Sequence, residues 1–209
     1  MLEDKKPLAQ LNIKYSDKSN RVTIFFRLFL AIPVIIIFLL LSDYSVSIHT
    51  GEFYFAMQFG AGFLFLPIML TIVFRQKYPK WWFDWVYELV KFSNRIAAYT
   101  MMLTDKYPST DEEQDVQINL EYPNAKEDLN RYFPLIKWLL AIPHFLILLT
   151  FWVIGFLLSP IVWLTVLIMG KMPEKLFIFL VGFMRYNLRV TAYSVLLITD
   201  EYPSFNWQE

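Results

Sequence analysis

The chain contains no cysteine among its 209 residues. This absence excludes disulfide bonds, thiolate nucleophiles, thiolate-bound zinc and cysteine-ligated iron–sulfur clusters. Charged residues are scarce too, at 18% of the chain, whereas soluble domains have about a quarter. Apolar residues make up 56% and aromatic residues 19%. This composition predicts a membrane protein.

Motifs that build catalytic or phosphate-binding sites are missing as well. The chain has none of the patterns G-x-x-x-x-G-K-[ST], G-x-G-x-x-G, H-E-x-x-H and G-x-S-x-G, each of which encodes a specific phosphate, metal or nucleophile geometry. It also lacks the basic domain typical of nucleic-acid binding. We therefore expect no enzymatic activity, no cofactor, no metal site and no nucleic-acid partner.

Two apolar segments in the first half are long enough to cross a bilayer. Residues 22–41 contain Arg27 as their only charge, and residues 53–74 contain none. At about 1.5 Å rise per residue, each matches a hydrocarbon core of about 30 Å. The segment between them, 42–52, has no Lys or Arg. We expect a transmembrane helical hairpin here.

The second half holds one longer apolar segment, from Trp138 to Gly170, without a formal charge. It is too long for one span and short for two spans with a loop. We expect spans at 135–152 and 156–170, with a turn near Gly155 to Pro160. A hairpin that enters the bilayer without fully crossing it is the alternative.

An amphipathic segment follows each expected hairpin, at 79–103 and 174–198. In these segments Lys91 and Arg95, like Arg185 and Arg189, are four residues apart and share one helical face. Helices lying in the membrane interface with these cations at the lipid headgroups fit both segments. Each hairpin is also preceded by a short stretch with strand periodicity, at 11–15 and 116–122.

Four segments recur in the same order along the two halves. As first and second copy, they are LNIKY at Leu11 and INLEY at Ile118, LAIP at Leu30 and Leu140, RIAAY at Arg95 and RVTAY at Arg189, and TDKYP at Thr104 and TDEYP at Thr199. The expected fold is mainly α and polytopic, with tandem repeats at 1–110 and 111–209. Each repeat contains a short strand, a transmembrane helical hairpin and an interfacial helix, and both enter the membrane from the same side.

The cations are strongly segregated along the chain. The N-terminal arm, the middle segment 75–131 and the tail from Lys171 carry seventeen of the nineteen Lys and Arg residues, and the expected outer loops carry none. By the positive-inside rule, both termini and the middle segment are expected on the cytoplasmic side.

The motifs LAIPH, NRIAAYTMMLTDKYP and RVTAYSVLLITDEYPSF resemble a bacterial membrane family known as domain of unknown function four-three-eight-nine. The likeness is good over Ile118 to Phe205 and looser over Leu11 to Pro108. The first copy departs from the second by having Val34 in place of His144 and by a longer outer loop. The resemblance implies tandem copies and residence in the bacterial inner membrane, and it implies no activity.

Arg27 and Lys137 lie about five residues inside apolar segments, where a charge is costly unless it reaches the interface or a partner. We expect both to extend toward cytoplasmic headgroups, and the alternative is pairing with Asp105 or Asp200. The expected headgroup-binding residues are Arg27, Lys91, Arg95, Lys137, Arg185 and Arg189. The Thr-Asp-x-Tyr-Pro segments that contain these acids are expected to be turns that cap local backbone donors.

Two further features have a structural and a functional interpretation. His144 is the only imidazole in the apolar segments, and we expect it to make a structural polar contact rather than to relay protons or bind a ligand. Trp81, Trp82 and Trp85 form an aromatic cluster where the interface is expected. The cluster is interpreted as an interfacial belt or as a docking surface for a partner protein.

These observations favour a small membrane accessory or scaffold subunit. It would bind membrane phospholipids and a larger membrane protein complex, with the tryptophan cluster as docking surface. The alternative is a small transporter or lipid-handling protein that uses Arg27, Lys137 and His144 around a path at the bilayer midplane. That alternative requires the three side chains to face one cavity.

Overall fold

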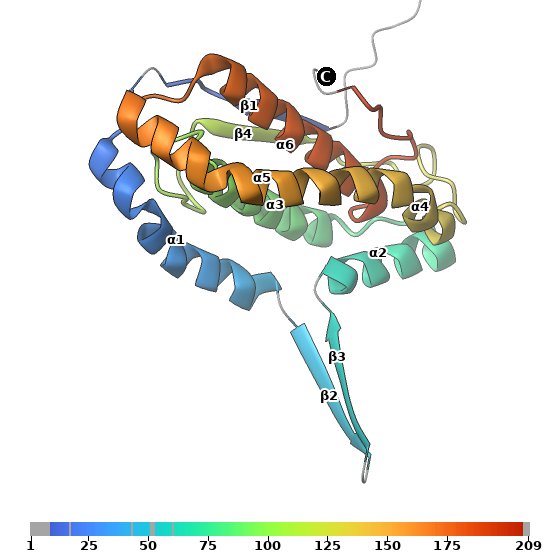
Figure 1. The fold of residues 1–209 in the computed structure, drawn as a ribbon. Coiled ribbons are helices and arrows are strands. Elements are labelled where there is room, and N and C mark those ends of the chain that lie inside the picture. Colours follow the sequence, from blue (N-terminus) through green and yellow to red (C-terminus); the bar gives the residue numbers. More distant parts are fainter. Residues whose placement is uncertain (1–8, 17, 43, 51–52, 60, 207–209) are drawn as a thin grey trace, which may run out of the picture.

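The computed structural model describes residues 9–16, 18–42, 44–50, 53–59 and 61–206, and the side chains of these residues outside 40–64. Figure 1 shows the elements, which are β1 (Ala9–Ile13), α1 (Arg21–Ser42), β2 (Tyr44–Thr50), β3 (Phe53–Phe59), α2 (Ala61–Arg75), α3 (Lys80–Thr100), β4 (Val116–Leu120), α4 (Pro134–Leu140), α5 (Ile142–Met169) and α6 (Glu174–Ser194).

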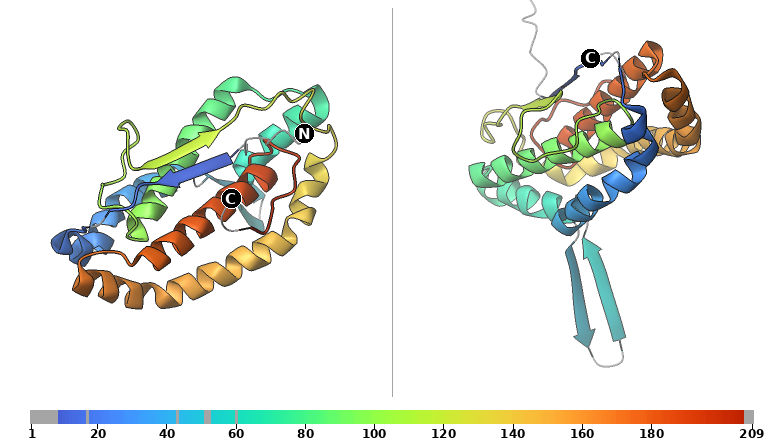
Figure 2. Two further views of the ribbon diagram at one scale, coloured as in Figure 1. Left: turned by 90° about the horizontal axis from the view of Figure 1, so that it is seen from above. Right: turned by 90° about the vertical axis from the view of Figure 1, so that its left-hand side faces the viewer.

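The helices and strands form a layered arrangement. Strands β1 and β4 pair on one side of the molecule, α3 and α6 pack against them, and α1, α2 and α5 lie on the side away from the sheet (Figure 2). Strand β1 packs against α6, and β4 packs against α3. Each strand therefore contacts a helix from the other half of the chain, and the two halves are not separate bodies.

The two strands expected from periodicity are confirmed, and they pair with each other. Strands β1 and β4 are antiparallel, with Leu11 opposite Ile118 and Asn12 opposite Gln117. In β4 the buried residues alternate with exposed ones, which is the pattern of a sheet with one face in the core. The sequence analysis did not predict this pairing. Leu11 and Ile118, the first residues of the repeated segments LNIKY and INLEY, form its central pair.

The expected second span at 53–74 is wrong. Residues Phe53–Phe59 form strand β3, which pairs with β2 from Thr50↔Phe53 to Tyr44↔Phe59, and only Ala61–Arg75 is helical. The sequence of β2, YSVSIHT, alternates apolar and polar residues, and that of β3 is rich in aromatics. Both features favour a strand over a helix. The turn expected at Gly51 lies outside the described residues.

The expected turn at Gly155 to Pro160 is also wrong, because α5 runs without a break from Ile142 to Met169. Proline inside a helix has no N–H, so the carbonyl four residues earlier loses its usual donor. The Ser159 hydroxyl donates to that carbonyl, on Phe156, at 2.8 Å. This hydrogen bond satisfies the carbonyl that Pro160 leaves without its usual donor.

Helices α3 and α6 occur where the amphipathic helices were expected, but their surroundings differ. About half of each helix is buried, and the buried residues include Val86 and Ile96 in α3 and Val181 and Leu188 in α6. These side chains pack against protein in the main core or its satellite clusters. The two helices therefore pack in the centre of the fold, and their position in the membrane interface stays a prediction.

Equivalent contacts occur at two places in the fold. The Tyr15 hydroxyl donates to the Met172 carbonyl at 2.7 Å, and the Tyr122 hydroxyl donates to the Tyr78 carbonyl. In the aligned segments Tyr15 matches Tyr122, and Tyr78 matches Met172. Each tyrosine thus crosses to the turn before the long amphipathic helix of the other half.

Candidate functional site

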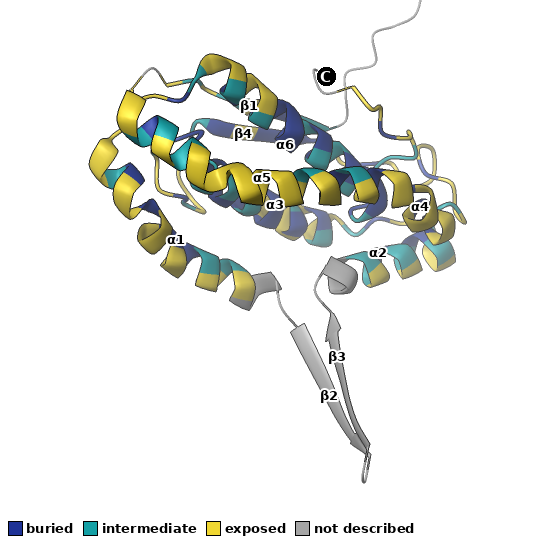
Figure 3. Cartoon of the chain, in the orientation of Figure 1, coloured by how far each residue is buried: buried dark blue, intermediate teal, exposed yellow. Residues whose placement is uncertain are grey.

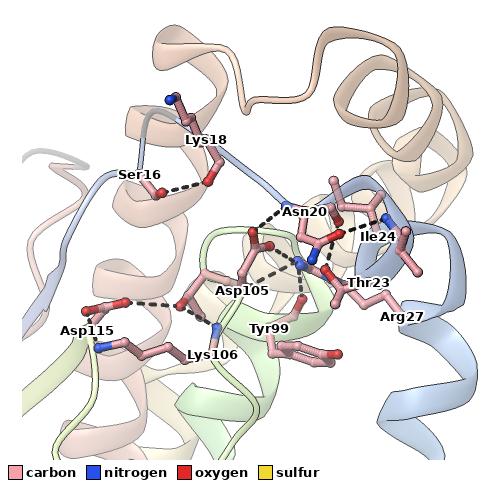
Figure 4. Close-up of polar contacts among 12 residues, drawn as sticks. Ser16, Lys18, Asn20, Thr23, Ile24, Arg27, Tyr99, Asp105, Lys106 and Asp115 are labelled. Carbon is pink, nitrogen blue, oxygen red and sulfur yellow. Dashed lines mark hydrogen bonds and ion pairs between the residues drawn. The ribbon is translucent and has the colours of Figure 1, made fainter.

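Arg27 is buried where α1 passes the end of α3 (Figure 4). Its guanidinium forms an ion pair with Asp105 and donates to the carbonyls of Tyr99 and Thr104, both at 3.2 Å. The backbone N–H of Asn20 donates to the same carboxylate at 2.8 Å. The guanidinium carbon lies 4.7 Å from the centre of the Tyr99 ring, close enough for a cation–π contact. These contacts bind the start of α1 to the turn after α3.

Lys137 in α4 makes the corresponding contacts in the second half. Its ammonium lies 2.6 Å from Asp200 and donates to the Thr199 carbonyl at 2.6 Å. The backbone N–H of Asn130 donates to Asp200 at 2.6 Å, and the ammonium lies 5.2 Å from the centre of the Tyr193 ring. Burial lowers the pKa of Lys137, and the hydrogen bond and charge of Asp200 oppose this shift.

The two ion pairs settle the alternatives for these cations. The expectation that Arg27 and Lys137 extend to headgroups is corrected, because their side chains are 2% and 0% exposed. The pairing with Asp105 and Asp200 is confirmed. An isolated charge in such a place would be costly, and a carboxylate with backbone acceptors offsets that cost.

The Thr-Asp-x-Tyr-Pro segments are turns, as expected. The Thr104 hydroxyl accepts the Lys106 N–H at 3.2 Å, and the Thr199 hydroxyl accepts the Glu201 N–H at 3.0 Å. The intervening aspartate is thereby held facing the cation of α1 or α4. The segments supply the carboxylates of the two ion pairs.

His144 is fully buried at the start of α5. Its Nδ1 lies 2.6 Å from the Tyr186 hydroxyl, its ring stacks on Phe205 at 4.4 Å, and Tyr202 lies 4.7 Å away. These contacts confirm the structural interpretation of this residue. Among the described residues, no three His, Cys, Asp or Glu side chains form a group that could hold a metal ion.

The cationic pairs of α3 and α6 make different contacts. Lys91 pairs with Glu88 at 2.9 Å, and Arg95 is buried and donates to the Ser109 carbonyl at 2.6 Å. In α6, Arg185 donates to the Leu11 carbonyl at 2.9 Å, and Arg189 donates to the Asn206 carbonyl. Binding of lipid headgroups by these four residues stays a prediction.

The tryptophan cluster lies at the start of α3. Trp81 and Trp85 are 69% and 41% exposed, whereas Trp82 packs against the core. The Trp82 ring lies 5.3 Å from that of Trp81 and 5.5 Å from that of Trp85. The exposed pair gives the first turns of α3 an apolar surface.

A large apolar surface covers α1, α2, α4 and α5 (Figure 3). In the described part of the chain, two helices are long and apolar enough to cross a membrane, α1 over Arg21–Leu39 and α5. A core helix of a soluble protein can also be long and apolar, but only 6% of the apolar window of α5 is buried. Every residue from Trp152 to Ile161 is exposed.

Two arginines that the sequence analysis did not single out bind the C-terminal ends of apolar helices. Arg21 donates to the Ile168 carbonyl at 3.1 Å at the end of α5. Arg131 donates to the carbonyls of Val73 and Phe74 at 2.6 and 3.3 Å at the end of α2. Both guanidiniums satisfy carbonyls that lack a partner within their helix. The signal was the position of each arginine just outside an apolar segment.

Residues 134–206 match the model of a protein family described as Domain of unknown function (DUF4389). The match covers the second of the two expected copies, and one copy is found rather than two. No curated protein and no solved structure matches the chain.

Proposed function

We propose that this chain is an integral membrane protein that works as a small accessory or scaffold subunit. It enters the bilayer through the apolar surface of α1, α2, α4 and α5, and it binds anionic lipid headgroups and a larger membrane protein. The observation that carries this proposal is the middle of α5, where ten consecutive residues from Trp152 to Ile161 are exposed.

The exposed side chains of α5 need an apolar environment. Phe156, Leu157 and Ile161 are 78%, 67% and 61% exposed, and burying each such side chain is worth about 1.5–3 kcal/mol. An interfacial helix keeps one polar face toward water, whereas this stretch of α5 has Ser159 as its only polar side chain. The hydroxyl of Ser159 is already bonded to the helix backbone. The helix is therefore suited to immersion in hydrocarbon.

The direction of the polar sheet favours insertion through one face over a multi-pass crossing. Strands β1 and β4 run alongside α5 across the molecule (Figure 2). A bilayer crossed lengthwise by α5 would also enclose this two-stranded sheet with its polar side chains, among them Gln10, Asn12 and Gln117, which are costly to bury in hydrocarbon. Insertion through one face keeps the sheet in water. The cation-rich segments that flank it then face the cytoplasm.

The two halves are proposed to be tandem copies related by an approximate two-fold axis through the pairing of Leu11 with Ile118. The paired tyrosine contacts and the paired aspartate contacts both support this relation. Such an axis lies along the membrane normal, because it maps one set of apolar helices onto the other. Both copies then meet the bilayer from the same side.

Arg21, Arg75, Arg131 and Lys171 are the cations best placed for lipid headgroups. All four are exposed and lie at the ends of α1, α2 and α5 or beside them. A cation near an anionic surface contributes on the order of 1 kcal/mol. Trp81 and Trp85 lie elsewhere, on α3, and are proposed to dock the partner protein.

A transporter that uses Arg27, Lys137 and His144 has less support. Each of these side chains is packed separately, against Asp105, Asp200 and Tyr186 respectively. A lipid-handling role for the apolar surface does not depend on them and is compatible with the same fold.

Purification from native membrane in mild detergent tests the proposal. We expect the chain to retain anionic phospholipid and a larger membrane protein. Combined Arg21→Gln and Arg131→Gln substitutions should reduce bound lipid and leave the partner, whereas Trp81→Ala with Trp85→Ala should release the partner and leave the lipid. Lys126→Gln, on the polar side, is the matched control and should change neither. A lone, lipid-free monomer would contradict the proposal.

A further inference from the structure

Arg95 is a buried cation without a carboxylate partner in the described part of the chain. Its residue is 6% exposed. One guanidinium nitrogen donates to the Ser109 carbonyl at 2.6 Å, and Nε is buried without a hydrogen-bond partner. Arginine stays protonated in proteins, so this site holds a full positive charge that one carbonyl only partly satisfies.

The other buried cations show what is missing. Arg27 and Lys137 each have an aspartate within ion-pair distance. A buried charge with a carboxylate partner is tolerated, whereas an unpaired one is costly. A bound anion would therefore stabilise the buried charge of Arg95, because no carboxylate in the described part of the chain pairs with it.

A polar cavity of about 450 Å³ lies beside Arg95, between α3 and strands β1 and β4. Lys91 lines it from the preceding turn of the same helix, and Glu113 contributes one opposing charge. Carboxamides and a phenol provide further hydrogen-bonding groups, namely Gln10, Asn12, Gln114, Gln117, Asn119 and Tyr87. A cavity of this size accommodates a small organic molecule rather than a single ion.

At the matching place in the second half, a side chain of α6 is bonded to strand β1. Arg185, which matches Lys91, reaches the strand and donates to the Leu11 carbonyl and to the Asn12 side chain. Lys91 turns instead to Glu88 on its own helix, and in α6 a glycine, Gly182, occupies the position that matches Glu88. The two halves therefore differ in the cation at this position: Arg185 is bonded to β1, whereas Lys91 is paired within α3 and lines the cavity.

We propose that this cavity binds a small phosphate ester that carries hydroxyl groups, with Arg95 and Lys91 on the phosphate and the carboxamides on the hydroxyls. Guanidinium and ammonium groups are the donors that proteins use for phosphate, and carboxamides both donate to and accept from hydroxyls. The cavity lies next to the sheet, away from the apolar surface of α5, which favours a water-soluble phosphate ester over a lipid headgroup as the source of the phosphate. The binding does not depend on the proposed membrane function.

Titration calorimetry on the full chain in neutral detergent tests this assignment. The probes are glycerol 3-phosphate, inorganic phosphate and, as neutral control, glycerol. We expect saturable binding of glycerol 3-phosphate, weaker binding of inorganic phosphate and none of glycerol. Arg95→Gln should weaken binding by about tenfold to a hundredfold, and Glu113→Gln should strengthen it. Lys126→Gln, which removes an exposed cation that does not line the cavity, should leave it unaltered.

Thermal unfolding without ligand separates binding from folding. Because Arg95 lacks a counter-ion, Arg95→Gln should unfold at the same temperature as the parent or higher, and it should lose the stabilisation that glycerol 3-phosphate gives the parent. If Glu113→Gln instead unfolds early and no phosphate compound binds, Glu113 is the counter-ion of Arg95 and the proposal is wrong. Vesicles with phosphatidylglycerol form the second arm. Arg95-dependent binding to vesicles alone would support the phosphate site and assign it to a lipid headgroup.

Discussion

The apolar helices of the two halves differ by one insertion. In the first half Pro33 and Pro79 are 46 positions apart, and in the second the matching Pro143 and Pro173 are 30 apart. The difference of sixteen residues equals the length of the β2–β3 hairpin from Tyr44 to Phe59. Helices α1 and α2 together therefore correspond to α4 and the continuous helix α5. The hairpin interrupts a helix that the fold can also accommodate uninterrupted.

The ion pairs of the two halves differ in their cation, which is an arginine in the first half and a lysine in the second. Arg27 contacts Asp105 and two carbonyls, whereas Lys137 contacts Asp200 and one carbonyl. Arginine has five N–H donors and keeps its proton, whereas lysine has three and can lose its proton when buried. Removal of the aspartate should therefore leave Arg27 charged, whereas Lys137 can become neutral.

Removing the carboxylates should have the largest effect on stability. Asp105→Asn leaves Arg27 charged and buried, which should lower the free energy of unfolding by about 3 kcal/mol. Asp200→Asn should cost less, because Lys137 can become neutral. Urea unfolding in mild detergent measures both. Equal losses would mean that the type of cation is irrelevant.

The loss of stability in Asp200→Asn and in Asp105→Asn should depend differently on pH. Burial lowers the pKa of Lys137 below its ordinary value of 10.5, and loss of Asp200 removes the opposing influence. Above the folded-state pKa the unfolded chain binds more protons, so the stability of Asp200→Asn should rise with pH toward that of the parent. The deficit of Asp105→Asn should stay constant between pH 7 and about 9.5. A constant deficit in both variants would contradict this account.

The second comparison concerns the pair His144 and Tyr186, which in the first half is replaced by Val34 and Phe92. His144→Val and Tyr186→Phe each remove one partner of a buried hydrogen bond and should cost about 1–3 kcal/mol. The double substitution recreates the apolar pair of the first half and should cost less than the sum, with a coupling of about 1 kcal/mol. Strict additivity in a double-mutant cycle would show that the hydrogen bond is not formed.

A smaller effect is expected at the ends of α2 and α5, where Gln76 and Gly170 match. Both have positive φ, 45° and 69°, a conformation that glycine adopts without strain. Gly170→Ala should lower stability by about 1 kcal/mol, because its new Cβ would also lie 3.3 Å from Arg21. Gln76→Gly should raise stability slightly. Thermal unfolding of both variants measures the difference, and a stabilising Gly170→Ala would argue against the match.

Deleting the hairpin should have the smallest effect. Strands β2 and β3 pair only with each other among the described elements. Removal of residues 44–59 gives the first half the helix length of the second, and it should change the free energy of unfolding by no more than about 1 kcal/mol. Asp105→Asn made in the shortened chain should keep its full cost. Loss of folding on deletion would show that the hairpin stabilises the junction of α1 and α2.

Much of this fold could be predicted from local pattern. Periodicity located β1, β4, α3 and α6, and the pairing of Arg27 and Lys137 with the aspartates of the Thr-Asp-x-Tyr-Pro segments was predicted only as the alternative to headgroup contact. The hairpin was missed because residues 53–74 were read by apolar content alone, although YSVSIHT alternates like a strand. The unbroken α5 was missed because Gly155 to Pro160 was interpreted as a turn, whereas the prolines inside α1, α2 and α5 are all accommodated within helices.

Features that depend on contacts between the halves could not be predicted from the sequence. The pairing of β1 with β4 brings Arg185 onto one strand and leaves Arg95 beside a cavity at the other. The burial of α3 and α6 has the same origin, since each helix is covered by a strand from the other half of the chain. The period of a single helix does not reveal which strand covers it.

Labelling of single introduced cysteines tests most directly whether the molecule enters the bilayer through one face. The chain has no cysteine of its own, so Tyr132→Cys and Lys171→Cys, which mark opposite ends of the α4 and α5 region, can each be probed alone. A maleimide that does not cross membranes should label both positions from the cytoplasmic side, and Phe156→Cys should react only after detergent is added. Labelling of Tyr132→Cys and Lys171→Cys from opposite sides would contradict insertion through one face.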